Sequence, residues 1–232
     1  MLGTVLTGAV ASPAFANGPE QLDQLEPDAG EWQAEYFTLL GDEGSEHLIE
    51  FLYGVNEKLA LGFEVEGEWE DGDLSFEEFG LVALYRVSDP QDDPIGLGFE
   101  AEAAFDDEVS LSEAEGRVIL ENITEKWWTQ ADLIVRHARE AGEGGTGLAY
   151  GTAINRSLGE DLWLGIEASG QLARLGGNPE LAPEGQHYLG PALTVERDVG
   201  SDGEVEIGLA YLARIAGEGP GSAVRIFVQF GF

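Results

Sequence analysis

Glutamate residues stand at every second position in several short stretches of this 232-residue chain. Side chains two residues apart lie on the same face of a β-strand, so each stretch predicts a column of carboxylates. Carboxylates gathered in a narrow, low-dielectric passage focus a negative potential and favour cations. The chemistry predicted from these residues is the binding or passage of small cationic solutes. The clearest columns are Glu64-Glu66-Glu68, Glu100-Glu102 and Glu113-Glu115.

A few arginines share these columns, and many neighbouring residues are glycine or alanine, which leave space around the charged groups. Two interpretations follow. The enclosed space selects cations, or Glu–Arg networks simply fill and brace it. Arg86 and Arg214 are also predicted to point inward. The residues predicted to line the interior are Glu50, Glu64, Glu66, Glu68, Glu100, Glu102, Glu113, Glu115, Arg117, Arg136, Glu167, Glu206 and Arg225.

The sequence gives little support for catalysis or for a metal site. It contains no cysteine, which excludes a thiolate nucleophile and thiolate metal ligands. Ser45 and His47 are the only nearby Ser–His pair, and neither this pair nor His137 or His187 belongs to a G-x-S-x-G elbow. No acidic turn matches an EF-hand-like loop, so these turns are interpreted as solvated charge runs. We predict no enzyme activity, no cofactor and no metal.

The charge balance excludes two further classes of function. The formal net charge is −34, with only 11 Lys and Arg residues. A basic footprint for nucleic acid is absent, and so is a polybasic anchor for a membrane surface.

The elements that must position the charged residues are strands. From Trp32 onward, apolar and polar side chains alternate in segments of about ten residues separated by small, acidic or Gly-rich breaks. In the last segment, apolar residues occupy the even positions from Val224 to Phe232, opposite Arg225 and Gln229, with Phe227 as the exception. We expect strands near residues 31–40, 46–55, 59–70, 76–87, 94–105, 111–122, 126–139, 146–156, 161–174, 186–197, 204–215 and 222–232.

Strands with an apolar face and a charged face fit a barrel whose outer surface is apolar and whose interior is polar. A soluble sandwich also alternates, but it encloses the apolar face, and aromatic girdles are not expected of it. We therefore predict an all-β, antiparallel, up-and-down transmembrane β-barrel of about twelve strands, with ten as the alternative. No window reaches 18 uninterrupted apolar residues, which excludes a spanning helix. The expected girdle residues are Trp32, Tyr36, Tyr53, Trp69, Tyr85, Trp127 and Tyr211.

The connections and the N-terminal region complete the predicted organisation. An even strand number places both ends of the barrel on one side, and the short loops argue against a large lid. Pro191 inside a strand requires a weakly paired point.

Residues 1–16 are apolar and end in Ala14-Phe15-Ala16, which predicts a signal peptide. Residues 17–30 are polar and predict a periplasmic tail or a small plug, followed by the barrel at 31–232.

The ending Ile226-Phe227-Val228-Gln229-Phe230-Gly231-Phe232 resembles the C-terminal signature of Gram-negative outer-membrane β-barrel proteins. The resemblance implies location in the outer membrane, contact with lipid and lipopolysaccharide, and recognition of Phe230 and Phe232 by the barrel-assembly machinery. It says nothing about cargo. The function expected is a narrow channel or binder for small solutes, with cations favoured. The alternative is a closed structural or interaction barrel without transport.

Overall fold

The computed structural model describes residues 19–22, 24–25, 28–41, 44–70, 72–200 and 203–232. Twelve strands form one closed antiparallel sheet in which each strand pairs with its neighbours in the sequence, and β1 pairs with β12. The strands are β1 (Trp32–Leu40), β2 (Ser45–Asn56), β3 (Leu59–Glu70), β4 (Asp73–Ser88), β5 (Gly96–Phe105), β6 (Leu111–Ile123), β7 (Trp127–Glu140), β8 (Glu143–Ser157), β9 (Leu162–Gly177), β10 (His187–Val199), β11 (Gly203–Ala216) and β12 (Ser222–Gly231).

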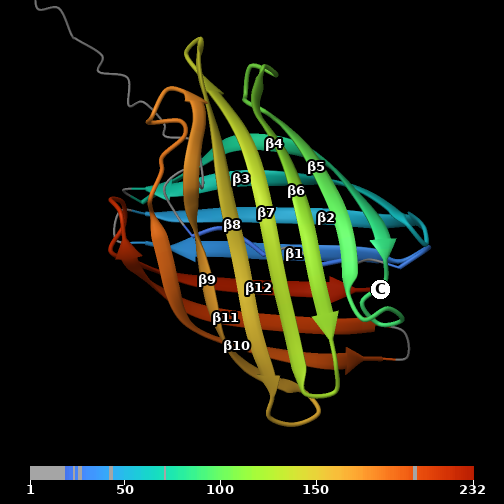
Figure 1. Ribbon diagram of the computed structural model, residues 1–232. Helices are drawn as coiled ribbons and strands as arrows, with labels where there is room; N and C mark the ends of the chain where they lie inside the picture. The colour runs from blue at the N-terminus through green and yellow to red at the C-terminus, as the bar shows by residue number, and fades with distance from the viewer. Residues whose placement is uncertain (1–18, 23, 26–27, 42–43, 71, 201–202) are drawn as a thin grey trace, which may run out of the picture.

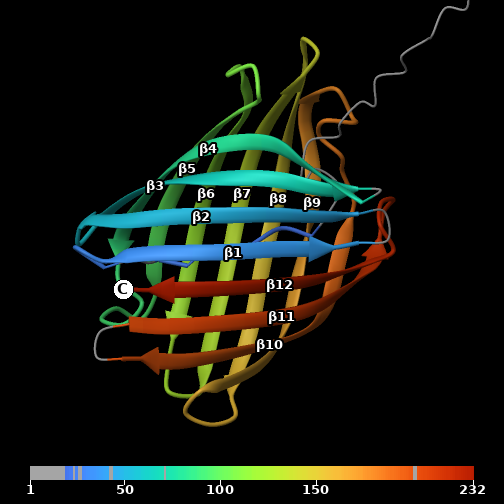
Figure 2. The ribbon, with the colours of Figure 1, turned by 180° about the vertical axis from the view of Figure 1, so that it is seen from behind.

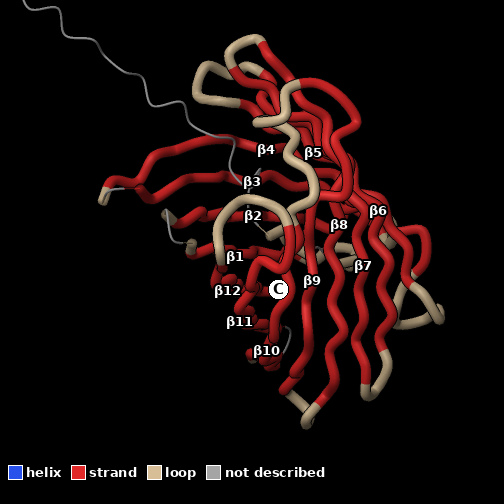
Figure 3. Tube along the Cα trace, turned by 60° about the vertical axis from the view of Figure 1, so that its left-hand side comes forward, coloured by secondary structure: helices blue, strands red, loops and turns tan. Residues whose placement is uncertain are grey.

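The predicted fold class is confirmed, and every predicted strand boundary lies within three residues of the observed one. The predicted signal peptide at residues 1–16 lies outside the described residues. We call the end where β1 begins and β12 finishes the terminal end, and the opposite end the loop end. Figure 3 shows that most connections are short, as predicted.

The strands are strongly tilted. In Figures 1 and 2 the wall made of β1–β3 and β10–β12 crosses the opposite wall, β6–β9, at a steep angle. Such crossing follows from the stagger that a closed sheet requires, because strands on opposite sides of a barrel tilt in opposite directions.

The ring is closed by the ladder between β1 and β12. Gln33 pairs with Gly231 at one end of this ladder, and Leu40 pairs with Val224 at the other. Beyond it, Trp32 N donates to Phe232 O at 2.8 Å, and Phe232 N donates to Trp32 O at 2.9 Å. No pair of edge strands is therefore left among the described strands, which is what an apolar surrounding demands of a sheet.

The outer surface of the wall is apolar along the length of the strands. Leu61 on β3 and Leu209 on β11 are 46% and 48% exposed. Glu64 and Glu206, which lie on the opposite faces of the same two strands, are buried. A surface of contiguous exposed Leu, Val and Phe would be costly in water, so this wall is built for an apolar medium. Of the predicted girdle aromatics, Tyr53 is half-buried and the others are exposed on the outside.

In the part of the chain that the structure describes, no helix has the length and apolar character needed to cross a membrane.

The sheet is interrupted at Pro191 in β10. Pairing between β10 and β11 runs to Leu189↔Ala213 and resumes at Ala192↔Ala210, so Gly190 and Pro191 have no partner in that ladder. On its other side Pro191 still pairs with Ile166 of β9. Proline lacks the N–H that a central strand needs, and the interruption is the local accommodation.

Candidate functional site in the barrel interior

The described residues that precede β1 enter the barrel interior. Leu25 is 1% exposed and packs against Ala60, Leu84 and Ile119, which project inward from β3, β4 and β6. Glu20 is also 1% exposed and accepts a hydrogen bond from Gln171 Nε2 of β9 at 2.5 Å. We call the described residues from Pro19 to Glu31 the inner segment.

Three lumen arginines contact the inner segment. Arg86 Nη1 donates to Leu25 O at 3.1 Å, and its Nη2 lies 2.6 Å from Asp28 Oδ1. Arg117 Nη1 donates to Gln21 O at 3.1 Å. Arg136 Nη2 lies 3.0 Å from Glu20 Oε2. The arginines come from β4, β6 and β7, so the segment is attached to one side of the wall at several depths.

A dense acidic cluster fills the centre of the barrel around a cavity of about 40 Å³. Arg136 binds Glu113 at 3.0 Å and Glu115 at 2.7 Å, and Arg117 binds Glu115 at 2.7 Å. Arg117 also lies 3.7 Å from Asp132 and 3.8 Å from Glu100. Eight glutamates thus surround the same cavity as two guanidinium groups, and Glu20, Glu100, Glu113 and Glu115 form ion pairs with them. The charged residues around this cavity are Glu20, Glu50, Glu64, Glu66, Glu100, Glu102, Glu113, Glu115, Arg117 and Arg136.

Across the lumen, the interior is more apolar and just as tightly filled. Arg225 of β12 forms an ion pair with Glu167 of β9. Phe227 of the same strand packs against a buried cluster that includes Phe37 and Leu48. The cavity on this side measures about 20 Å³. Phe227, the exception in the alternating pattern, is therefore an inward-facing core residue.

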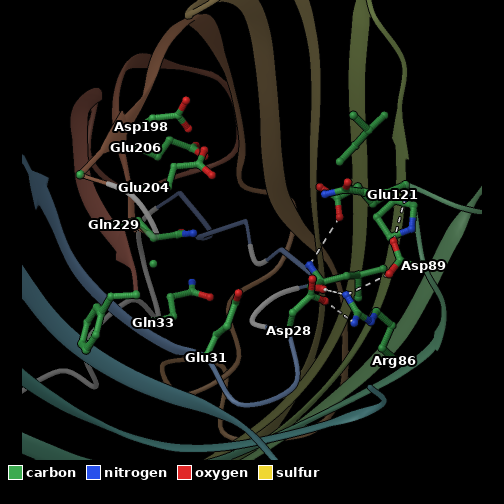
Figure 4. A pocket seen from close by; sticks show the side chains of 18 residues that line it. Asp28, Glu31, Gln33, Arg86, Asp89, Glu121, Asp198, Glu204, Glu206 and Gln229 are labelled. Carbon is green, nitrogen blue, oxygen red and sulfur yellow. Dashed lines mark hydrogen bonds and ion pairs between the residues drawn. The ribbon is translucent and has the colours of Figure 1, made fainter. Parts of the chain in front are cut away.

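A larger chamber of about 400 Å³ lies at the terminal end of the lumen (Figure 4). Among the described residues, Arg86 is the single basic side chain around it, and Asp89 Oδ2 lies 3.3 Å from Arg86 Nη1. The other polar side chains point into the same space from both sides. In the part of the chain that the structure describes, seven carboxylates surround the chamber, those of Asp28, Glu31, Asp89, Glu121, Asp198, Glu204 and Glu206.

At the loop end, the connection between β9 and β10 folds against the inside of the wall. It buries Leu181 and Ala182, which are 5% and 2% exposed. A Cβ on Gly145 would lie 3.0 Å from Ala182 Cβ, so the fit of the loop to β8 requires a glycine there. The described loops contain no large folded lid, but this one narrows the lumen.

The structure places the sequence-predicted interior residues at different depths. Most surround the central cavity, while Glu206 belongs to the chamber, and Glu167 and Arg225 belong to the opposite wall. Glu68 lies farther toward the loop end, beyond a register shift between Glu66 and Gly67, and does not border the central cavity.

Besides Asp28, Glu31, Asp89 and Asp198 of the chamber, sequence reasoning missed four carboxylates that lie deeper in the interior. Glu35, Glu121 and Asp132 occupy inward positions on β1, β6 and β7. Continuing the alternation residue by residue would have found them, because each stands two positions from another inward residue. Glu20 gave no such signal, because it precedes the first strand.

The Ser45–His47 pair lies on the outer surface near the loop end. Ser45 Oγ is 2.9 Å from His47 Nε2, and Tyr36 Oη is 2.8 Å from His47 Nδ1. Among the described residues, no group of three or more His, Cys, Asp or Glu side chains is arranged to hold a metal ion.

No protein-family model and no curated protein matches this chain. Solved outer-membrane barrels do match it in structure. The COG4313 outer membrane channel from Pseudomonas putida F1 has a TM-score of 0.60 at 11% identity, over 95% of this chain and 98% of that one. The NanC porin has a TM-score of 0.58 at 10% identity, over 87% and 98% of the two chains. The KdgM porin has a TM-score of 0.51 at 12% identity, over 86% and 98%. At these identities the likeness shows the fold alone, which is that of Gram-negative outer-membrane β-barrels, as the ending of the sequence implied.

Proposed function

We propose that this chain forms a narrow outer-membrane channel for small solutes that favours cations. The proposal rests chiefly on the acidic chamber of about 400 Å³ at the terminal end, where the described residues set seven carboxylates against one guanidinium. Because these carboxylates are grouped at one mouth of a low-dielectric wall, their negative potential concentrates cations there and repels anions.

The outer wall supports the membrane part of this proposal. Exposed aliphatic and aromatic side chains cover the strands from end to end, and the backbone groups are paired around the ring. Both properties are required of a sheet that meets lipid. We place the terminal end in the periplasm, since barrels with an even number of strands have both ends there.

Two further partners belong to the proposal. Phe230 of β12 is 47% exposed, and Phe232, directly after the strand, is 62% exposed, so both are accessible for contact with the barrel-assembly machinery. At the loop end, acidic turns such as Asp106 to Glu108 would meet lipopolysaccharide through bridging divalent cations.

A closed barrel without transport is the second candidate function. The observation in its favour is the tight filling of the middle of the lumen, where the two cavities measure about 20 and 40 Å³. A cavity of 40 Å³ holds a water molecule or two, not a hydrated path. Under this interpretation, the Glu–Arg network is a brace.

Single-channel recording in planar bilayers with a KCl gradient tests the proposal. We expect discrete conductance steps. The reversal potential should shift from zero toward the equilibrium potential of K⁺, which shows that K⁺ crosses more readily than Cl⁻. The variant Glu31→Gln/Asp198→Asn/Glu204→Gln should move the reversal potential toward zero, because it removes three chamber charges. A matched control, Asp107→Asn/Glu108→Gln/Glu125→Gln, removes three charges from exposed turns and should leave it unchanged. Anion preference would refute the cation selectivity, and a folded barrel without conductance would favour the closed barrel.

A further inference from the structure

The inner segment fits the wall at positions where the wall has no side chains. Gly96 and Gly98 of β5 form a notch that receives Leu25: a Cβ on Gly96 would lie 2.8 Å from Leu25 Cδ1, and a Cβ on Gly98 would overlap Leu25 Cδ2. Both distances are shorter than ordinary van der Waals contact. The floor of the notch is apolar, made by Ala60 and Ile119.

A second notch receives the other leucine of the segment. A Cβ on Gly151 of β8 would lie 2.6 Å from Leu22 Cδ2. Leu22 and Leu25 therefore insert into separate parts of the wall, at β8 and at β5, which are three strands apart in the ring. If these strands faced an empty lumen, a residue with a side chain would fit at either position, and glycine would not be required.

The polar contacts between segment and wall are complementary in charge. Among the described acids of the inner segment, only Glu20 lies deep in the lumen. It forms an ion pair with Arg136 and accepts a hydrogen bond from Gln171. The neutral amides face acids instead: Gln21 Nε2 donates to Glu35 at 2.9 Å, and Gln24 Nε2 donates to Glu206 at 3.2 Å.

The main chain of the segment is held as well. Arg86 and Arg117 donate to the carbonyl oxygens of Leu25 and Gln21, both at 3.1 Å, and Leu25 N donates to Glu121 Oε2 at 3.4 Å. Two leucine notches, an acid matched to an arginine and main-chain contacts at two positions together define a binding site for an extended peptide.

This peptide separates the spaces of the lumen. Leu25 borders the 400 Å³ chamber, Glu20 and Gln21 border the central acidic cavity, and Gln21, Leu22 and Gln24 border the cavity on the opposite side. We propose that the lumen wall is a built docking site for the inner segment, and that the docked segment closes the passage until it leaves the glycine notches. The closure rests on the proposed transport function, whereas the docking does not.

A labelling experiment on the full-length protein in lipid vesicles tests the docking. The native chain has no cysteine, so Leu25→Cys introduces a single thiol. Combined with Gly98→Leu, which fills the notch, this thiol should react with a bulky water-soluble maleimide at least tenfold faster than in the native wall. Gly116→Leu is the matched control, because a Cβ on Gly116 meets no atom within 4 Å and its side chain would point to the outside. Equal labelling rates in all three proteins, each shown to be folded by heat-modifiable gel mobility, would overturn the docking site.

Conductance tests the closure. Deletion of residues 19–25 should raise the open probability of the channel at least tenfold. Gly98→Leu should also raise the open probability, whereas Gly116→Leu should leave it unchanged. The double variant Leu25→Cys/Gly98→Cys should stay closed when oxidised and open when reduced. Fast labelling without increased conductance would refute closure by the segment. A folded deletion variant with no conductance at all would refute transport itself, and the labelling result would then stand alone for the docking site.

Discussion

Leu133 lies near the middle of β7 on the outer face of the wall, with 46% of its surface exposed. It stands six residues from the first residue of the strand, which at about 3.3 Å per residue and a tilt of about 40° places it roughly 15 Å from the terminal end. That is the middle of an apolar band about 25–30 Å tall. Its neighbours Asp132 and Ile134 point inward and are buried, at 3% and 0% exposure.

We expect Leu133→Arg to lower the free energy of unfolding by about 2–4 kcal/mol, because the guanidinium would lie in hydrocarbon. This corresponds to a roughly 30-fold to 700-fold change in the folding equilibrium. Val199→Arg introduces the same side chain at the last residue of β10, where the native residue is 53% exposed, and should cost about 1 kcal/mol or less. Leu133→Met controls for the loss of leucine, since it conserves volume and polarity.

Equilibrium unfolding in denaturant, with the protein in lipid vesicles and followed by tryptophan fluorescence, measures all three changes. If the free energies of unfolding of Leu133→Arg and Leu133→Met differed by less than about 0.5 kcal/mol, this face of the wall would not lie in hydrocarbon. An equal cost at Val199 would refute the depth dependence and with it the assignment of the strand ends to the membrane surface.

The remaining predictions concern the interior. Arg136→Met should lower the free energy of unfolding by about 3–5 kcal/mol, because it leaves three buried carboxylates without their shared cation; a stability equal to the native protein in the same vesicle assay would contradict this. Phe227→Ala should cost about 3 kcal/mol with an unchanged denaturant dependence, since it empties space beside an interior cluster, and a loss below about 1 kcal/mol would mean that the cluster collapses to fill it. Raising KCl from about 0.1 to 1 M shortens the screening length from about 10 to 3 Å, so the permeability ratio of K⁺ to Cl⁻ should fall toward one. A ratio that does not respond to salt would place the origin of selectivity outside the carboxylates.

The wall could be predicted from the sequence because the period of two is a local property of each strand. Once Val224 and Ile226 are assigned to the outside, every other residue of β12 follows, including the inward Arg225. The interruption at Pro191 followed from proline's missing N–H, whereas the register shift at Gly67 has no such local signal because it depends on how β3 pairs with β4.

The inner segment could not be predicted from the same pattern. Its position depends on contacts between residues far apart in the chain, such as Leu25 with Gly98 and Gln24 with Glu206. Nothing in the periodicity of the sequence from 17 to 30 signals that described residues such as Leu22 and Leu25 contact the inside of the wall. Glycines in a strand pattern do signal close approach of another group, but the sequence does not identify that group.

The ladder that joins β1 to β12 also sets the order of events during folding. Gln33 and its partner Gly231 lie near opposite ends of the described chain, so the strands between them must be arranged before these two residues can pair. Until then, any partial sheet of these strands has two free edges that could join other chains. The barrel therefore cannot mature strand by strand into stable pieces, and its survival depends on how long the unfinished sheet is kept apart from its copies.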